Sequence, residues 1–205
     1  SDNGLQVIGI SDVTGFPEMM DGRVKTLHPK VHAGILARRH RADDLAALAE
    51  HGIRPIDLVV VNLYPFAQAA AKPGLQFDHL VEEIDIGGPS MVRAAAKNFR
   101  DVLIVVEPAD YDRVADALAS AEGPSLALRF DLMRKALAHT AAYDTAITST
   151  LEQVSLNGTE FERAPGALLG TTTMLSLGKL RDLRYGENPH QKAAWYTSGA
   201  RDQAT

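Results

Sequence analysis

The chain has 205 residues, of which 45% are hydrophobic and 23% charged, as is ordinary for a soluble globular protein with a buried core. Its formal net charge of −5 argues against nucleic-acid binding through an overall basic surface, although a few local positive groups could bind a small phosphorylated anion. The lack of cysteine excludes disulfides, thiolate metal sites and a cysteine nucleophile. No apolar run is long enough to span a bilayer and no signal peptide is recognisable, so we expect a cytoplasmic protein without a membrane partner.

Strand and helix patterns alternate along the chain. Apolar alternation predicts a short strand over residues 5–10, followed by a turn-like stretch over 11–17. An almost unbroken apolar run over 57–64 is typical of a strand buried on both faces, and Pro65 ends it. The other patterns predict a second buried strand over 101–107 and helices over 31–39, 41–51, 77–83, 89–98, 108–121 and 126–154.

Alternating strands and helices indicate a doubly wound α/β fold with a mostly parallel sheet. In such sheets ligands bind beyond the carboxyl ends of the strands, which directs attention to residues 62–66 and to the loop after Val106. Between residues 156 and 177 the composition turns to Gly, Thr and Pro without a clear period, which indicates a linker. A different segment begins at Leu180.

A basic cluster lies at residues 22–28. Arg23 offers a planar fork for phosphate, Lys25 a mobile point charge and Thr26 a neutral donor, so on a loop at a helix start the three could hold a phosphorylated ligand. A solvated basic turn explains the same residue types, and these types alone favour that alternative.

Further polar residues follow the predicted strand and separate two predicted helices. Asn62 and Tyr64 could face a ligand crevice or merely satisfy the strand-to-loop turn. The glycine pair after Asp85 could let backbone N–H groups approach a ligand closely. Lys97 could share proton transfer with Asp85 in a cleft, or simply be a helix-end charge favoured by the helix dipole.

Other site classes find little support in the sequence. His28 and His32 are four residues apart, but no third metal ligand occurs at a recognised spacing, so we predict no metal site. Neither a dinucleotide-binding G-x-G-x-x-G, a P-loop nor a G-x-S-x-G elbow is present.

Taken in order, the motifs resemble a known family. The sequence is similar to the IMP cyclohydrolase domain of the bifunctional purine-biosynthesis enzyme at SDVTGFPE from Ser11, DGRVKTLHP from Asp21, HAGIL from His32, NLYPF from Asn62, IDIGG from Ile84 and RAAAKN from Arg93. RYGENPHQ from Arg184 resembles the opening of the second domain of that enzyme, the AICAR transformylase. The likeness covers nearly the whole chain and is weakest over residues 156–178.

The resemblance implies a fold of the methylglyoxal-synthase-like (MGS-like) type, an αβα layered domain. It implies a cyclohydrolase domain over residues 1–155 that lacks the family's first strand and phosphate loop, so the chain is expected to be N-terminally truncated. A linker over 156–179 and the start of a cytidine-deaminase-like transformylase domain over 180–205 would follow. The activity of such a fragment is itself a question, because part of its phosphate site would be missing.

The implied reaction closes 5-formamidoimidazole-4-carboxamide ribonucleotide to IMP with loss of water. It needs no metal or redox cofactor, whereas the transformylase half formylates AICAR with 10-formyltetrahydrofolate as co-substrate. The expected partners are the small purine nucleotide and a second copy in a homodimer, with no nucleic acid. Two alternatives of other classes are a non-catalytic nucleotide-sensing MGS-like module and a purely structural dimerisation fragment.

The resemblance also implies roles for individual residues. Lys97 matches the family's catalytic lysine and is expected to pair with Asp85 in acid–base work, with Lys25 and Tyr64 as further catalytic positions. The residues that match substrate-binding positions are Arg23, Thr26, Asn62, Ile86, Gly87 and Gly88 in the cyclohydrolase part, and Arg184 and Tyr185 in the transformylase part.

Overall fold

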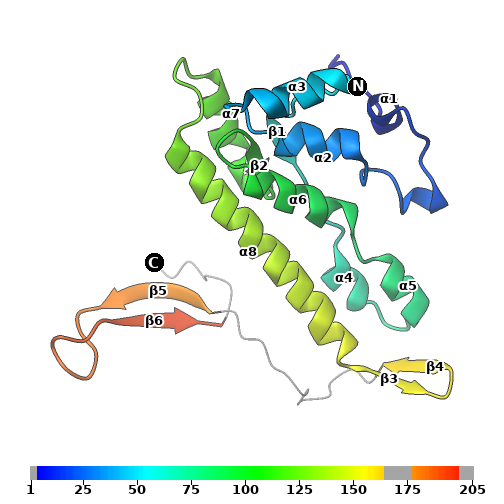
Figure 1. The fold of residues 1–205 in the computed structure, drawn as a ribbon. Coiled ribbons are helices and arrows are strands. Elements are labelled where there is room, and N and C mark those ends of the chain that lie inside the picture. Colours follow the sequence, from blue (N-terminus) through cyan, green and yellow to red (C-terminus); the bar gives the residue numbers. More distant parts are fainter. Residues whose placement is uncertain (1–3, 164–176, 199–205) are drawn as a thin grey trace. The chain divides into compact units, whose positions relative to one another are not determined.

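The computed structural model describes residues 4–163 and 177–198 (Figure 1). The chain divides into two compact units between residues 147 and 148. The first unit is an α/β structure around a parallel pair of strands, β1 (Leu58–Val60) and β2 (Leu103–Val105). Its helical elements are α1 (Ile10–Thr14), η1 (Met20–Gly22), α2 (Pro29–Leu36), α3 (Ala42–Glu50), α4 (Phe66–Ala70), α5 (Phe77–Glu82), α6 (Gly87–Lys97), η2 (Pro108–Asp110), α7 (Tyr111–Ala119) and most of α8 (Leu126–Leu151). The predicted α/β class with parallel strands is therefore confirmed.

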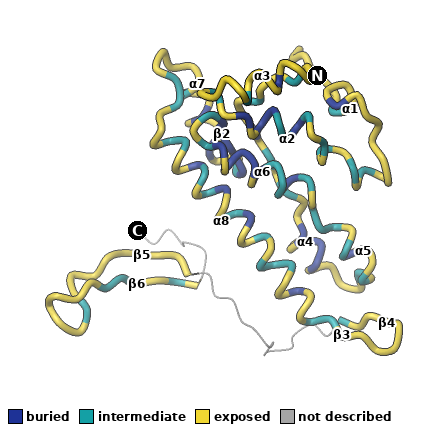
Figure 2. Tube along the Cα trace, in the orientation of Figure 1, coloured by how far each residue is buried: buried dark blue, intermediate teal, exposed yellow. Residues whose placement is uncertain are grey.

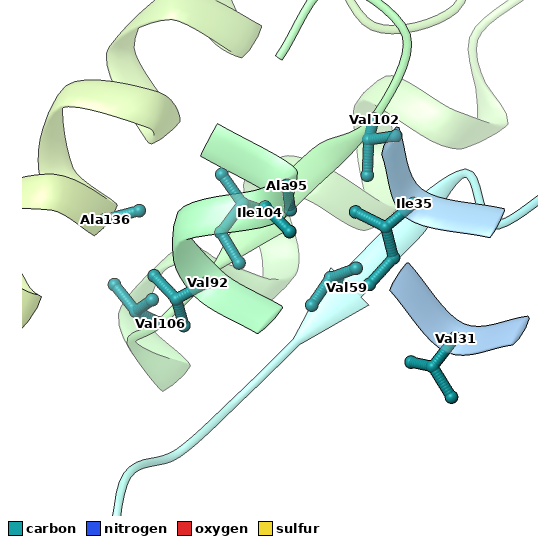
Figure 3. Close-up of a cluster of buried hydrophobic side chains, with 10 residues drawn as sticks. Val31, Ile35, Val59, Val92, Ala95, Val102, Ile104, Val106 and Ala136 are labelled. Carbon is teal, nitrogen blue, oxygen red and sulfur yellow. The ribbon is translucent and has the colours of Figure 1, made fainter. Parts of the chain in front are cut away.

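Helices cover β2 on both faces. Neighbouring side chains of a strand point to opposite faces, so successive residues of β2 pack against different helices. Ile104 joins a buried cluster with Val59, its partner in the strand register, and with residues of α2 and α6 (Figure 3). Leu103 and Val105 join a second cluster instead, with Val114 of α7 and Leu132 of α8. All three residues of β2 are buried, which explains why its sequence is an uninterrupted apolar run (Figure 2).

The ends of α2 and α6 explain two polar residues of the family-like motifs without invoking chemistry. His28 precedes α2, and its Nδ1 accepts a hydrogen bond of 3.1 Å from the backbone N–H of Lys30, while Pro29 occupies the first helical position. At the other end, the buried Asn98 amide donates to the carbonyl oxygens of Ile35 and Ala37 at 2.8 and 3.0 Å. Asn98 thereby ties the end of α6 to the end of α2.

A third buried cluster lies beyond the carboxyl end of β1. It consists of Phe66 and Ala70 from α4 and Leu80 from α5, with Tyr143 and Ile147 of α8 packed against it. The rings of Phe66 and Tyr143 meet edge to face with centroids 6.4 Å apart. One long helix, α8, therefore contributes residues to all three clusters.

Several predicted elements differ from the structure. Residues 5–9 are not a strand, and α1 begins at Ile10; the side chains of Leu5 and Val7 are 70% and 72% exposed. A strand needs a neighbouring strand to satisfy its backbone, and residues 5–9 belong to none of the sheets in the described part of the chain. The helix predicted from Pro89 begins two residues earlier, at Gly87.

The second unit contains two antiparallel hairpins. One pairs β3 (Val154–Asn157) with β4 (Glu160–Arg163), and the other pairs β5 (Gly178–Leu183) with β6 (Ala193–Thr197). The first hairpin occupies the start of the segment in which the composition predicted a linker, while residues 164–176 lie outside the described part. The domain boundaries at residues 155 and 180 remain predictions.

Candidate functional site

A cavity of about 620 Å³ opens where three segments of the first unit meet: residues 18–27, residues 60–64 at the end of β1, and residues 81–91. Nine of the twelve predicted site residues line it, namely Arg23, Lys25, Thr26, Asn62, Tyr64, Asp85, Ile86, Gly87 and Gly88. The cavity lies at the carboxyl end of β1, where parallel α/β sheets bind ligands.

The loop that carries the basic residues is tightly folded. Met19 and Val24 form an isolated antiparallel bridge, and between them Met20 and Asp21 adopt left-handed conformations with φ of 56° and 52°. Gly22 follows with φ of 92°, and a Cβ built on it would lie 2.7 Å from Glu18 Oε1. The positive φ therefore favours glycine at this position, and a Cβ there would also push aside the end of the Glu18 side chain.

Carboxylates hold both basic side chains of this loop. Arg23 forms an ion pair with Glu82 of α5 at 2.8 Å, and Lys25 forms one with Glu18 at 3.1 Å. The side chains of Arg23 and Lys25 remain 60% and 49% exposed, so water screens the two pairs. An anionic ligand could therefore compete for both cations at little cost.

The amino-terminal end of α6 forms the opposite wall. Asp85 Oδ1 accepts a hydrogen bond of 2.9 Å from the backbone N–H of Gly88, which satisfies one of the free donors of the first turn. A Cβ on Gly87 would meet Thr26 Oγ1 in a severe clash, and one on Gly88 would lie 2.9 Å from Leu63 Cδ2 and closer still to the Asp85 carboxylate. The two glycines thus let the Thr26 loop, Asp85 and the helix end pack together.

This arrangement suits an anion. The first turn of an α-helix presents N–H groups and the positive end of the helix dipole. Thr26 lies against this turn, and Arg23 and Lys25 line the same cavity. The sequence suggested that the glycines expose backbone N–H groups, and the structure adds a packing reason for both of them.

Lys97 lies away from the cavity. It is the exposed last residue of α6, whereas Asp85 precedes the first, and the 11 residues of the helix put its ends about 15 Å apart. The expected direct pairing of Lys97 with Asp85 is therefore not found in this structure. An acid and a lysine twelve residues apart can meet only if the chain turns between them, and here it continues as a helix.

Arg184 and Tyr185 lie in the second unit, in the connection between β5 and β6. Both are exposed, and Gly186 N donates to Gln191 O to close the turn that follows them. Their role as substrate contacts stays a prediction.

The sequence did not single out three acidic or phenolic groups of the site. Glu18 and Glu82 line the cavity as partners of Lys25 and Arg23. The hydroxyl of Tyr143, which lies outside the lining, accepts a hydrogen bond from the backbone N–H of Asp85, and burial raises the pKa of this phenol above its usual range. Glu18 lies within a motif and could have been noted, but Glu82 and Tyr143 are separated from the basic loop by 59 and 120 residues, so no local pattern reports them.

The described residues contain neither a candidate metal-binding group nor a membrane-spanning helix. No group of three or more histidines or carboxylates is arranged to hold a metal ion in residues 4–163 and 177–198. Over the same residues, no helix is both long and apolar enough to cross a membrane.

Comparisons with known proteins extend these observations. A family model described as AICARFT/IMPCHase bienzyme matches residues 95–205, and one described as an MGS-like domain matches residues 1–90. The chain is also similar to the solved structure titled "Crystal structure of ForH", with 40% sequence identity and a TM-score of 0.62, over 72% of this chain and 76% of that chain. The MGS-like match confirms the fold type that the motifs predicted.

Proposed function

Since this chain belongs to the AICARFT/IMPCHase bienzyme family of purine biosynthesis, we propose that it is the cyclohydrolase part of such an enzyme. Its reaction would close 5-formamidoimidazole-4-carboxamide ribonucleotide to IMP with loss of water. We further propose that the protein acts in the cytoplasm as a homodimer, and that residues from 180 onward begin a transformylase domain that uses 10-formyltetrahydrofolate. Arg184 and Tyr185 would contact the substrate of that second domain.

The observation that supports this proposal best is the convergence of nine expected residues on one cavity. They come from segments up to 65 residues apart (Arg23 to Gly88), and the fold brings all nine to the lining of this space. A volume of about 620 Å³ lies within the range of small-molecule sites. Positive groups on one side and the end of α6 on the other suit a phosphorylated nucleotide.

In the proposed reaction the carboxamide nitrogen attacks the formyl carbon carried by the same imidazole ring. A C–N bond forms, the formyl oxygen becomes a hydroxyl, and this hydroxyl leaves as water to give the aromatic pyrimidinone ring. Both reacting groups are already on one molecule, so the protein mainly holds them in a reactive orientation. Neither a metal nor a redox cofactor takes part in the proposed steps.

Among the carboxylates that line the cavity we assign proton transfer to Asp85, because its Oδ1 is fixed by the backbone N–H of Gly88, whereas Glu18 and Glu82 form ion pairs with Lys25 and Arg23. Lys25 and the backbone near Tyr64 would stabilise the oxygen as negative charge develops on it. Lys97 occupies the family's catalytic-lysine position, and we propose that it contributes to turnover without pairing with Asp85 in the ligand-free chain.

A second function receives support from the same geometry. The separation of Lys97 from Asp85 and the charge-paired state of Arg23 and Lys25 are compatible with a nucleotide-sensing module that binds without turnover. Such a module would still use the cavity but would need no proton-transfer group.

Spectrophotometric measurement of IMP formation from the synthetic formylated ribonucleotide separates the two functions. We expect turnover by the chain, and loss of turnover with retained IMP binding in Asp85→Asn. Saturable IMP binding with no turnover in the unmodified chain would instead favour the sensing module. Absence of both binding and turnover would contradict either function.

A further inference from the structure

The hydroxyl of Tyr143 connects α8 to the segment that carries Asp85. It accepts a hydrogen bond of 2.8 Å from the backbone N–H of Asp85 and donates one of 3.2 Å to the carbonyl oxygen of Glu83. A phenol can do both at once, because it carries one proton and accepting lone pairs. The segment 83–85 is therefore held by a side chain 58 residues further along the chain.

The Tyr143 ring is itself fixed. Its edge-to-face contact with Phe66 involves a ring that is only 1% exposed, and Ile84 and Ile147 pack into the same cluster. Burial raises the pKa of the phenol, so the hydroxyl keeps its proton, and thus its donor, throughout the physiological pH range. The hydroxyl therefore fixes the Asp85 backbone relative to the buried cluster in which the Tyr143 ring packs.

Asp85 is thereby restrained at two points. Tyr143 fixes its backbone N–H, and the backbone N–H of Gly88 fixes its carboxylate. Tyr143 does not belong to the lining of the cavity, whereas Asp85 does. We propose that Tyr143 is a positioning residue that holds the Asp85 carboxylate at its place in the cavity; the proposal rests on the proton-transfer role proposed for Asp85.

A pair of variants on α8 tests this role in the full chain. Tyr143→Phe removes the hydroxyl and keeps the ring against Phe66. Thr140→Val is the matched control, because Thr140 is buried and its hydroxyl donates to Leu137 O within the same helix. For both variants, kcat, KM, the melting temperature and the amide exchange of residues 83–88 are measured.

We expect Tyr143→Phe to lower kcat about tenfold, since a small displacement of a catalytic group is costly, with KM changed less than about twofold. Exchange at residues 83–88 should rise, and Thr140→Val should match the unmodified chain in both readouts. An unchanged kcat in Tyr143→Phe would overturn the proposal. So would a loss of kcat shared equally by Thr140→Val, because that would show a general effect on α8.

The readouts also separate this proposal from the proposed function. If the unmodified chain has no turnover, the cyclohydrolase assignment fails, and the comparison moves to the Kd for IMP. A Kd at least fivefold higher in Tyr143→Phe, with faster exchange confined to residues 83–88, would still support a positioning role in the site. Equal Kd and equal exchange would overturn it.

Discussion

Arg23 and Glu82 form a two-contact ion pair at the rim of the cavity, with Nε–Oε2 and Nη2–Oε1 distances of 3.1 and 2.8 Å. The pair joins the basic loop to the end of α5. Both side chains are more than half exposed, so the pair contributes about 1 kcal/mol at most. Glu82 therefore orients the Arg23 guanidinium, but the pair is weak enough for a ligand phosphate to replace the Glu82 carboxylate.

Replacing Glu82 by Gln should strengthen the binding of an anionic nucleotide. The substitution removes the carboxylate that competes for Arg23, so we expect the Kd for IMP to fall by up to about fivefold. Isothermal titration calorimetry at low and high salt measures the effect, which should shrink as salt screens the charges. Glu50→Gln, an exposed site at the end of α3, is the control for the loss of one negative charge. Equal gains in both variants would show a general charge effect and contradict the competition.

Adding one methyl group at Gly88 should damage the site. The new Cβ would collide with the Asp85 carboxylate and with Leu63, so Asp85 or the start of α6 must shift. We expect at least a tenfold loss of IMP formation, because misplacing a catalytic group by about 1 Å is costly. The matched control is Gly178→Ala, where the new Cβ would meet Thr197 O at an ordinary contact distance of 3.9 Å. Full activity in Gly88→Ala would show that the close packing is dispensable.

Lys97→Ala should lower turnover far more than it weakens IMP binding, if the family's catalytic-lysine position retains its role here. Lys97 lies at the far end of α6, so its loss should leave the Kd for IMP nearly unchanged. Steady-state kinetics and calorimetry measure the two quantities, with Lys72→Ala as the control for a lost exposed lysine. Full activity in Lys97→Ala would remove this residue from the mechanism and leave Asp85 as the proton-transfer group.

Acid should destabilise the chain partly through Asp44. Hydrogen bonds from the side chain and backbone of Arg38 hold the pKa of this carboxyl well below its usual range. A lowered folded-state pKa stabilises the fold above the unfolded-state pKa of about 3.9 and loses that effect as the pH falls through the folded value. Asp44→Asn should therefore lower the melting temperature at pH 7, and the difference should shrink below about pH 4. Thermal unfolding between pH 7 and pH 2 measures this, with Glu122→Gln as an exposed control; a difference independent of pH would contradict the linkage.

Much of the fold was predictable because it rests on local patterns. The apolar runs identified β1 and β2 of the first unit but none of the strands β3 to β6, and the helices α3, α5 and α8 begin within a few residues of their predicted starts. Residues 5–9 were assigned wrongly, because alternation reports a strand only where a neighbouring strand is available. The short helix α4 was missed, since five residues after Pro65 carry too little periodicity to be recognised.

The site was predictable only in part, for a different reason. Ordered motifs identified the residues that line the cavity, but no pattern in the sequence specifies distances between segments. Direct contact between Asp85 and Lys97 is not found, because Asp85 lies before the first residue of α6 and Lys97 is its last, while their shared acid–base role stays a prediction. The contacts of Glu82 and Tyr143 depend on packing between α5, α8 and the basic loop, which only the folded chain defines.

The helix α8 also sets the order in which the molecule can mature during synthesis. Leu132, Ala136 and Tyr143 of this helix complete three separate clusters, and their partners were made up to 105 residues earlier (Val31 to Ala136). A chain that leaves the ribosome from its amino-terminal end must expose these apolar surfaces until α8 emerges. The nascent chain therefore keeps these apolar surfaces exposed until α8 has emerged, and the Asp85 segment gains its contact with Tyr143 only after that.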